Sequence, residues 1–341
     1  IDTEVAAGRV PDTPAVRLRR VQALVELGEA VPARAMLADL KATDPWEWRV
    51  SWFEGLLLLA AASASASTAR HAAIAGCDKA SLPVTMKGML TLGTDNPAYP
   101  PYYQGGETDA HPNWQFNDPY TGAGFEAAVA YAVAERLGFT QDQVEWTVAP
   151  FNQTYKPGPT AWDFAIEQIS FSEKRAQAVD FSDSYYDVNQ ALIANNGTPA
   201  ASATSIADLA DLSLAAPIGT TSYDFIVNTI MPTQEAGAFS TLADTVAALA
   251  AGQVDAIVVD LPTALYLADP YVQEGTDFKV VGQFETAAAG EYFGMTFEKG
   301  SPLVACVDLA LADLKDDGSL QAIQTEWLSQ KTNVGEVPVL G

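Results

Sequence analysis

Two ionisable residues of opposite charge follow apolar segments of this chain, and they are the first candidates for chemistry. Arg175 lies in "SEKRAQAV", where Ser172 is a predicted helix N-cap that places the guanidinium in the first helical turn. The field of that turn favours anions, so a cation there indicates that a negative group visits. Asp260 ends the apolar run "VDAIVVD" (254–260). Arginine binds carboxylates through paired hydrogen bonds and aspartate binds ammonium groups, so the pair fits the two ends of an α-amino acid.

Further polar residues stand where other predicted strands end. Asp95 follows "LTLGT", and Ser170 lies in "QISFSEKR". The segment "IGTTSYDF" (218–225) places Thr220 and Thr221 at a predicted helix start, whose N–H groups suit an anion. Because ligands in open α/β sheets bind beyond the carboxyl ends of strands, we expect these groups to meet at one site.

Composition bounds the partners and cofactors. The chain has 341 residues, of which 48% are hydrophobic, so it can form a sizeable core. Its 18 Lys and Arg against 43 Asp and Glu give a net charge of −25, which disfavours nucleic acid as a partner. Two histidines, and two cysteines without a CxxC pair, predict neither a metal site nor a cofactor. The longest apolar run, residues 56–62, is far shorter than the roughly 20 residues of a membrane-spanning helix.

The first 62 residues are predicted to form a small helical appendage. Three segments with helical spacing of apolar residues are separated by short breaks, with Gly28 after the first and Pro32 at the start of the second. Residues 63–81 are rich in Ala and Ser and show no periodicity, so they are predicted to be a linker.

From residue 88 onward, apolar strands alternate with helices. "GFEAAVAYAVAERLG" (124–138) carries apolar residues at helical spacing, and "STLADTVAALAAGQ" opens with a capping box from Thr241 to Asp244. The β-branched run at 254–260 is typical of a buried strand. Further strands are predicted at 88–95 and 144–151, and further helices at 301–318 and 319–330. Repeated βαβ units predict a mostly parallel sheet, and their total length predicts two lobes.

Six motifs, in order, resemble those of the extracytoplasmic solute-binding proteins of family 3, which serve amino-acid ABC transporters. They cover about residues 82–330 and read "LTLGTDNPAYPPYY", "GFEAAVAYAVAERLG", "ISFSEKRAQAVDFSDSYYDVNQALIA", "GTTSYDF", "AAGQVDAIVVDLPTALYL" and "FGMTFEKGSPL". The helical appendage resembles the tetratricopeptide segment of actinobacterial protein kinase G.

The resemblance implies an α/β protein with a two-lobe, type II periplasmic-binding-protein fold, a Venus-flytrap closing over one polar, glutamine-like amino acid. The crossing strands would be 189–197 and 278–284. The implied first lobe is 82–193 with 282–330, the second is 194–281, and 331–341 is a C-terminal tail. We expect a monomer outside the cytoplasm that delivers its ligand to an ABC permease and has no enzyme activity.

The same resemblance assigns roles to individual residues. Arg175, helped by Ser170 and the backbone amides of Thr220 and Thr221, would bind the α-carboxylate, and Asp260 would hold the α-amino group. The remaining implied contacts are Tyr99 or Tyr102 stacking with Phe151 on the ligand side chain, Asp95 at the mouth of the first strand loop, and the Gln168 carbonyl near the ammonium group. The loops within 104–121 and 151–162 are longer than the family leads us to expect, and could shape the rim of the cleft.

Other interpretations of these residues and of the function remain open. Arg175 could be a surface charge, Asp260 and the two threonines could only cap helices, and the aromatic residues could be core or rim. A dehydratase acting on cyclohexadienyl or arogenate substrates shares this fold, but it needs an acid over the leaving group, for which Glu167 is the one candidate. A third alternative is a ligand sensor or adaptor whose helical appendage presents the lobes to a partner.

The two cysteines favour a disulfide. Cys77 and Cys306 flank one globular region of an acidic chain, which suggests an oxidising compartment and a Cys77–Cys306 bond. Two alternatives remain: "IAGC" satisfies a lipobox pattern, so lipidation could anchor Cys77 to a membrane, or both thiols could be free and buried.

Overall fold

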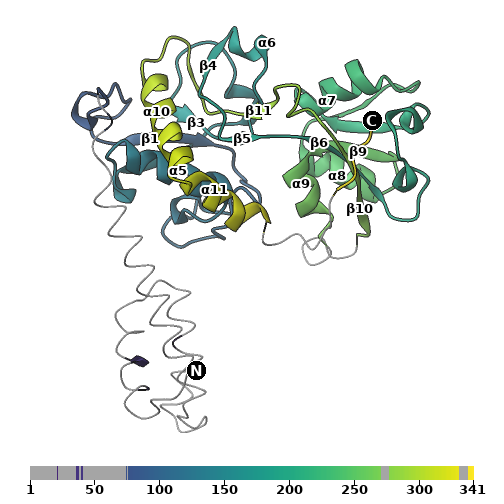
Figure 1. The fold of residues 1–341 in the computed structure, drawn as a ribbon, viewed down its shortest axis with the longest axis horizontal. Coiled ribbons are helices and arrows are strands. Elements are labelled where there is room, and N and C mark those ends of the chain that lie inside the picture. Colours follow the sequence, from purple (N-terminus) through teal and green to yellow (C-terminus); the bar gives the residue numbers. More distant parts are fainter. Residues whose placement is uncertain are drawn as a thin grey trace. The chain divides into compact units, whose positions relative to one another are not determined.

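The chain divides into two units, Ile1–Ala72 and Ala73–Gly341, which are described separately. The computed structural model describes residues 21, 36, 37, 40, 74, 76–269, 276–329 and 337–341 (Figure 1). The four described residues of the first unit are helical, and three of them, Val21, Leu37 and Leu40, are buried. The rest of the predicted appendage, and the predicted linker up to Ala73, lie outside the described residues. No described helix is long and apolar enough to cross a membrane.

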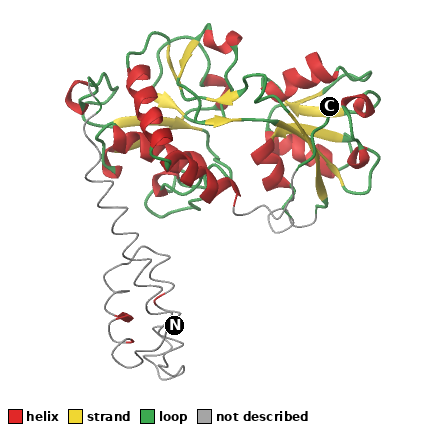
Figure 2. Cartoon of the chain, in the orientation of Figure 1, coloured by secondary structure: helices red, strands yellow, loops and turns green. Residues whose placement is uncertain are grey.

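The second unit contains two five-stranded sheets and a two-stranded one, each large sheet with helices beside it (Figure 2). The first sheet has the order β2-β1-β3-β12-β4 and the second the order β10-β6-β9-β7-β8, while β5 pairs with β11. The strands are β1 Leu90–Thr94, β2 Val144–Val148, β3 Phe164–Ala165, β4 Val179–Phe181, β5 Tyr186–Asp187, β6 Gln190–Asn195, β7 Leu214–Pro217, β8 Gly237–Phe239, β9 Ala256–Asp260, β10 Phe278–Phe284, β11 Tyr292–Phe293 and β12 Thr296–Glu298.

The helices fall close to the predicted segments. The α-helices are α5 Phe125–Arg136, α6 Glu173–Ala176, α7 Thr221–Phe225, α8 Leu242–Ala250, α9 Leu261–Leu267, α10 Leu303–Asp316 and α11 Ser319–Gln324. Short 3-10 turns are η1 Lys79–Ser81, η2 Pro119–Thr121, η3 Gln141–Gln143, η4 Phe151–Gln153, η5 Ala200–Ser202 and η6 Ile206–Leu209, and the π-helical turns are η7 Ile226–Ile230 and η8 Thr325–Ser329. Half of the predicted capping box at α8 is present: Thr241 Oγ1 accepts a hydrogen bond from Asp244 N at 3.1 Å, and the Asp244 carboxylate accepts from the Thr241 hydroxyl at 2.8 Å instead of from the Thr241 backbone N–H.

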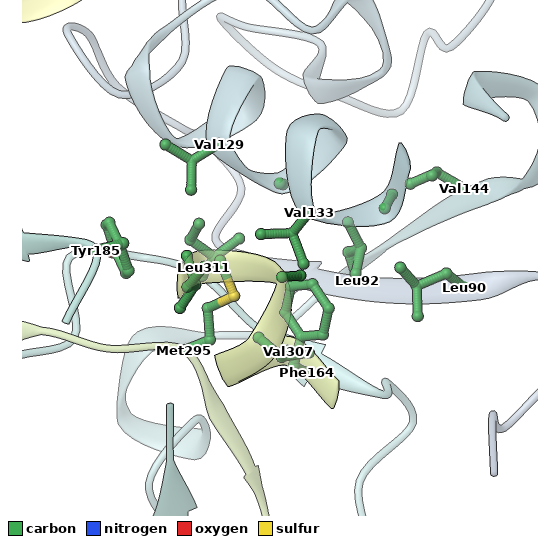
Figure 3. Packing of buried hydrophobic residues seen from close by; sticks show 14 of the residues in the cluster. Leu90, Leu92, Val129, Val133, Val144, Phe164, Tyr185, Met295, Val307 and Leu311 are labelled. Carbon is green, nitrogen blue, oxygen red and sulfur yellow. The ribbon is translucent and has the colours of Figure 1, made fainter. Parts of the chain in front are cut away.

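The first lobe is the sheet β1–β4 and β12 with α5 and α10 packed against it. β1 runs parallel to β2 and β3, as the βαβ pattern predicts, whereas β12 returns antiparallel to β3 and β4. Figure 3 shows Val133 of α5 and Leu311 of α10 meeting Leu92 of β1 in one apolar cluster. Burial of these side chains holds the carboxyl ends of β1 and β3 in fixed positions at the edge of the lobe.

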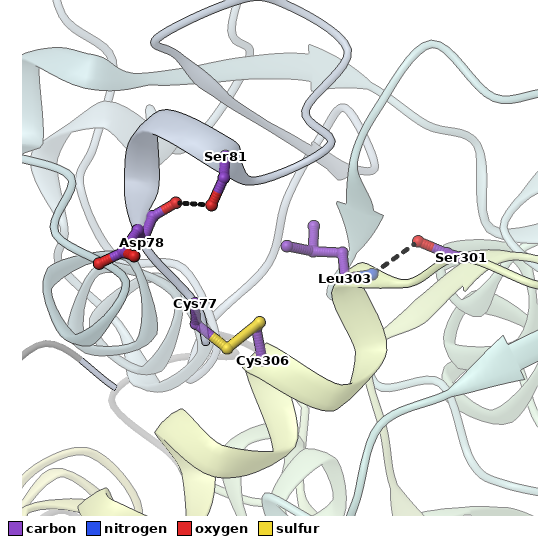
Figure 4. Close-up of a disulfide and its surroundings, with 6 residues drawn as sticks. All are labelled: Cys77, Asp78, Ser81, Ser301, Leu303 and Cys306. Carbon is purple, nitrogen blue, oxygen red and sulfur yellow. Dashed lines mark hydrogen bonds between the residues drawn. A yellow bond between two sulfur atoms is a disulfide. The ribbon is translucent and has the colours of Figure 1, made fainter. Parts of the chain in front are cut away.

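A disulfide closes this lobe. Cys77 is bonded to Cys306 of α10, with the two Cα atoms 5.7 Å apart (Figure 4). Both cysteines are buried in the cluster of the first lobe, so residues just after the predicted linker are tied to a helix near the end of the chain. The predicted disulfide is confirmed, and it uses the Cys77 sulfur atom that the lipidation alternative requires.

The second lobe is the sheet β6–β10 with a separate apolar cluster on each face. Side chains of β6 alternate between the faces: Leu192 and Ala194 lie in one cluster, and Ala191 and Ile193 lie in the other. Burial on both faces explains the continuous apolar sequence of this strand.

Two passages between the lobes lie within the described residues. β6 and β10 pair antiparallel within the second sheet, and β5 and β11 pair beside the first, so the passages fall at 187–190 and 284–292. The segment assigned from sequence to a C-terminal tail is described from residue 337 and extends the second sheet. Val339 bridges to Gln283, and Leu340 is buried in the second lobe.

Candidate functional site

Arg175 lies where the sequence predicted it, in the first turn of a helix. Ser172 is the N-cap of α6, and its hydroxyl accepts a hydrogen bond from Arg175 N at 3.2 Å. The side chain turns inward and is only 8% exposed. Its Nη1 donates to the Ser170 carbonyl at 2.6 Å, and its Nη2 donates to the Gly219 carbonyl of the second lobe at 2.9 Å. Burial lowers the pKa of Arg175, and no described carboxylate forms a salt bridge with it.

Two aromatic rings cover the guanidinium. The Arg175 Cζ atom lies 5.5 Å from the ring centroid of Phe151 and 4.4 Å from that of Tyr155. The two rings meet edge to face with centroids 5.4 Å apart. Phe151 was expected to stack on a ligand side chain, and here it lies beside the arginine. Sequence reasoning missed Tyr155, although it flagged the long loop that carries it.

Asp260 occupies the N-cap position of α9, but its side chain makes no capping hydrogen bond. Instead, its Oδ1 accepts from Gln190 Nε2 at 2.8 Å, and the same Nε2 donates to Glu291 Oε1 at 3.0 Å. Burial, and then the charge of Glu291, raise the pKa of Asp260 to about 7, while Gln190 and Arg175 act in the opposite direction. No described cation forms a salt bridge with Asp260.

The hydroxyl residues divide into two roles. Thr221 Oγ1 lies 3.2 Å from Ser170 Oγ, which joins the second lobe to the first beside Arg175. Thr220 is the N-cap of α7, and its hydroxyl accepts from Tyr223 N at 3.1 Å and donates to the Pro217 carbonyl at 2.7 Å. The structure therefore brings Thr221 to the arginine and gives the Thr220 hydroxyl local partners.

The two candidate tyrosines have different surroundings. Tyr102 is buried, and its hydroxyl lies 3.0 Å from Thr263 Oγ1 of α9, so it also spans the lobes. Tyr99 is 39% exposed, with its ring centroid 5.6 Å from that of Phe116. Asp95 lies at the end of β1, where its Oδ1 accepts from Asn96 N at 2.8 Å.

Two carboxyl groups of the first lobe, those of Glu126 and Glu167, are buried. Glu126 of α5 accepts hydrogen bonds from Gln168 N at 2.6 Å, from Gln168 Nε2 and from the Tyr185 hydroxyl. Burial raises the pKa of Glu126 to about 7. Gln168 has a positive φ of 47° and is held to Glu126 by both groups. Glu167 is 6% exposed, and burial followed by the charge of Asp95 raises its pKa well above the usual value.

A crevice of about 300 Å³ lies next to the Tyr102–Thr263 contact. Its walls include Pro101 and Trp327 from the first lobe and Leu265 and Tyr266 from α9. Neither Arg175 nor Asp260 lines it.

Two α/β lobes joined by chain passages, with polar groups of both lobes facing each other, define the class of two-lobe, type II periplasmic binding proteins. The chain belongs to the family of bacterial extracellular solute-binding proteins, family 3, which residues 103–330 match. Residues 2–83 match the protein kinase G tetratricopeptide repeat.

Individual relatives agree with this assignment. The chain is 26% identical over 169 residues to the ABC transporter glutamine-binding protein GlnH of Bacillus subtilis, a match covering 49% of this chain and 58% of that protein. An ancestral arginine-binding protein bound to glutamine is similar, with 27% identity and a TM-score of 0.57 over 72% of this chain and 100% of that chain. The ancestral amino acid-binding protein AncCDT-1, a precursor of cyclohexadienyl dehydratase, shares 25% identity with a TM-score of 0.55, over 71% of this chain and 96% of that one.

Proposed function

We propose that this protein captures a polar L-amino acid outside the cytoplasmic membrane and delivers it to an ABC importer. One observation carries the proposal. The first lobe holds a buried arginine and the second a partly buried carboxyl group, and neither forms a salt bridge among the described residues. Leaving a charge buried and unpaired is costly, so these groups favour a ligand that carries both opposite charges.

In this proposal, Arg175 binds the α-carboxylate through the guanidinium N–H groups that the two carbonyls leave unused, and Ser170 and Thr221 assist. Asp260 binds the α-amino group, with Gln190 fixing the direction of its carboxylate. Tyr102, Tyr99 and Phe151 border the ligand side chain, and Asp95 and the Gln168 carbonyl lie on the first-lobe side. The names of the GlnH relative and of the glutamine-bound ancestral protein support a glutamine-like ligand.

Each lobe supplies only part of the ligand's partners, so the ligand binds the closed form better than the open one. That difference in affinity shifts the population towards closure, and a permease that recognises the closed form receives only loaded protein. The charge-assisted hydrogen bonds at each end contribute about 1.5–3 kcal/mol, enough to select amino acids over ligands lacking one charged group.

Isothermal titration calorimetry of the full chain with free L-amino acids tests the proposal. The amino acid that binds is then compared with its α-amide, which lacks the carboxylate, and with its deaminated analogue, which lacks the ammonium group. We expect both analogues to bind at least about 10-fold more weakly, because each loses one charge-assisted contact. Absence of heat with every free amino acid would contradict the proposal.

Glu167 gives the dehydratase alternative one observation in its favour. Burial raises the pKa of Glu167 well above its usual value, which favours the protonated form that an acid catalyst needs. We expect no turnover of prephenate or arogenate in an ultraviolet absorbance assay. Steady conversion that disappears in Glu167→Gln would instead establish an enzyme.

A further inference from the structure

Tyr155 contacts Arg175 from a loop that is longer than the family pattern leads us to expect. It follows η4 within the 151–162 loop, and its ring centroid lies 4.4 Å from the Arg175 Cζ atom. The ring also packs edge to face on Phe151. A guanidinium stacked on an aromatic face keeps its N–H groups directed outward in the plane, where a carboxylate can be bound through two of them.

The same tyrosine reaches the second lobe. Its hydroxyl donates a long hydrogen bond of 3.5 Å to the Gly219 carbonyl, which also accepts Arg175 Nη2 at 2.9 Å. Gly219 has a φ of 81°, and a Cβ atom there would lie 3.2 Å from the Tyr155 hydroxyl. Glycine therefore suits this position both for its backbone conformation and for the close approach of the tyrosine. Two donors of the first lobe thus meet one carbonyl of the second, so this contact breaks when the lobes move apart.

We propose that Tyr155 is a positioning residue that holds the Arg175 guanidinium in its ligand-binding orientation and latches the closed lobes through Gly219. The ligand part of this inference rests on the proposed function, whereas the latch does not need a ligand. With the lobes latched, the ligand leaves only after the Tyr155 and Arg175 contacts to Gly219 separate, so Tyr155 controls the dissociation rate more than the association rate.

Stopped-flow tryptophan fluorescence on the full chain measures both rates, since the chain has seven tryptophans. The probe is L-glutamine or L-arginine, whichever binds the native protein more tightly. In Tyr155→Ala we expect dissociation to be roughly 10-fold faster, because a desolvated cation–π contact is lost. The association rate should change by less than about twofold. Tyr155→Phe keeps the ring and should restore the dissociation rate to within about threefold of native. Lys156→Ala, an exposed neighbour in the same loop, is the matched control and should leave both rates unchanged.

A second arm measures closure without any ligand. Fluorescence energy transfer between dyes on Leu309→Cys of α10 and Val227→Cys of η7 reports the distance between lobes, because both positions are exposed and the native cysteines are already bonded to each other. We expect the closed fraction to fall most in Tyr155→Ala and to stay below native in Tyr155→Phe, which lacks the hydroxyl that donates to the Gly219 carbonyl.

The two arms separate the possible failures. A native protein that binds no amino acid overturns the proposed function, and the energy-transfer arm still decides on the latch. A protein that binds normally, with unchanged dissociation and closure in Tyr155→Ala, overturns the latch and leaves the proposed function standing. Slower dissociation in Tyr155→Ala would also overturn it.

Discussion

The two lobes hold a charged group away from water in different ways. The first lobe surrounds Arg175 with aromatic rings and a backbone carbonyl, whereas the second lobe gives Asp260 a single side-chain amide, that of Gln190. The first arrangement fixes a planar cation in one orientation. The second arrangement raises the pKa of the Asp260 carboxyl group to about 7, so this group titrates near neutral pH. The comparison teaches that the first lobe presents a cation whose orientation is fixed by its neighbours, and that the second presents a carboxyl group whose ionisation can respond to a ligand.

The lobes also differ in how their cores are secured. The disulfide joins Cys77 to Cys306 across 229 residues of sequence, and both cysteines lie in the first lobe. The second lobe contains no cysteine and relies on the two apolar faces of its sheet. A crosslink over so long a segment strongly reduces the conformational freedom of the unfolded chain. Because both cysteines lie in the first lobe, we expect that lobe to gain most of the stabilisation.

The largest expected effect comes from removing that crosslink. In Cys77→Ser with Cys306→Ser, we expect the free energy of unfolding to fall by about 2–5 kcal/mol, because the unfolded chain regains the closed loop's freedom. Hydrogen exchange followed by mass spectrometry should show the loss in α10 and β1, with little change in β6 and β9. Equal loss of protection in both lobes would break the comparison between them.

Removing the cation of the first lobe should abolish tight binding. In Arg175→Ala we expect the dissociation constant of the amino acid to rise at least about 100-fold, since truncating a buried partner of a charge pair costs about 2–5 kcal/mol. Calorimetry measures the change. Lys174→Ala is the matched control, because Lys174 is exposed on the same helix and should change affinity less than about twofold. An Arg175→Ala protein that still discriminates the free acid from its α-amide would contradict the assigned role.

The acid of the second lobe should give binding a pH dependence. An ammonium group needs the ionised carboxylate, so affinity should rise as the pH rises through about 7, by at most about 10-fold per pH unit, with release of a proton on binding. The sign is opposite for stability: the folded protein keeps this proton above the usual pKa of 3.8, so Asp260 lowers the free energy of unfolding as the pH rises towards 7.

Calorimetry between pH 5.5 and 8 in buffers of different ionisation heat measures both affinity and proton release. Asp260→Asn should weaken binding about 10-fold at pH 8 and flatten the pH profile. Glu126, whose pKa is also about 7, contributes to the same charge field, so a residual slope in Asp260→Asn belongs to it. Glu235→Gln removes a charge from an exposed position of the second lobe and serves as the control. If affinity depended on pH in Asp260→Asn as it does in the native protein, the titrating group would be a residue other than Asp260.

The sequence predicted the features that depend on local chemistry. Ser172 as N-cap, the helix at α5 and the strand ending at Asp260 follow from capping and periodicity, and the structure has all three. The opposite charges of Arg175 and Asp260 pointed to an amino acid because charge complementarity can be read from residue types.

Contacts between loops could not be predicted in the same way. The Tyr155 contact to Gly219 joins residues 64 apart in sequence, and neither loop has a periodic pattern that fixes which aromatic residue faces the arginine. Gln168 adopts a positive φ and is held by Glu126, a polar residue inside a helix whose burial the helical spacing alone does not reveal. The last residues join the second sheet through a single bridge at Val339, too short to carry a strand signal.

The smallest expected effect tests whether stability of the second lobe can change without changing the cleft. Thr241 caps α8 through its hydroxyl, and α8 packs on β7 and β9. In Thr241→Ala we expect a loss of about 1 kcal/mol in the free energy of unfolding, measured by chemical denaturation, while Thr241→Ser should keep most of the capping hydrogen bond. The amino acid affinity of both variants should stay within about twofold of native, because the carboxyl group of Asp260 keeps its partners. If Thr241→Ala lost amino acid affinity and Thr241→Ser did not, the packing of α8 inside the second lobe would affect the position or charge of Asp260.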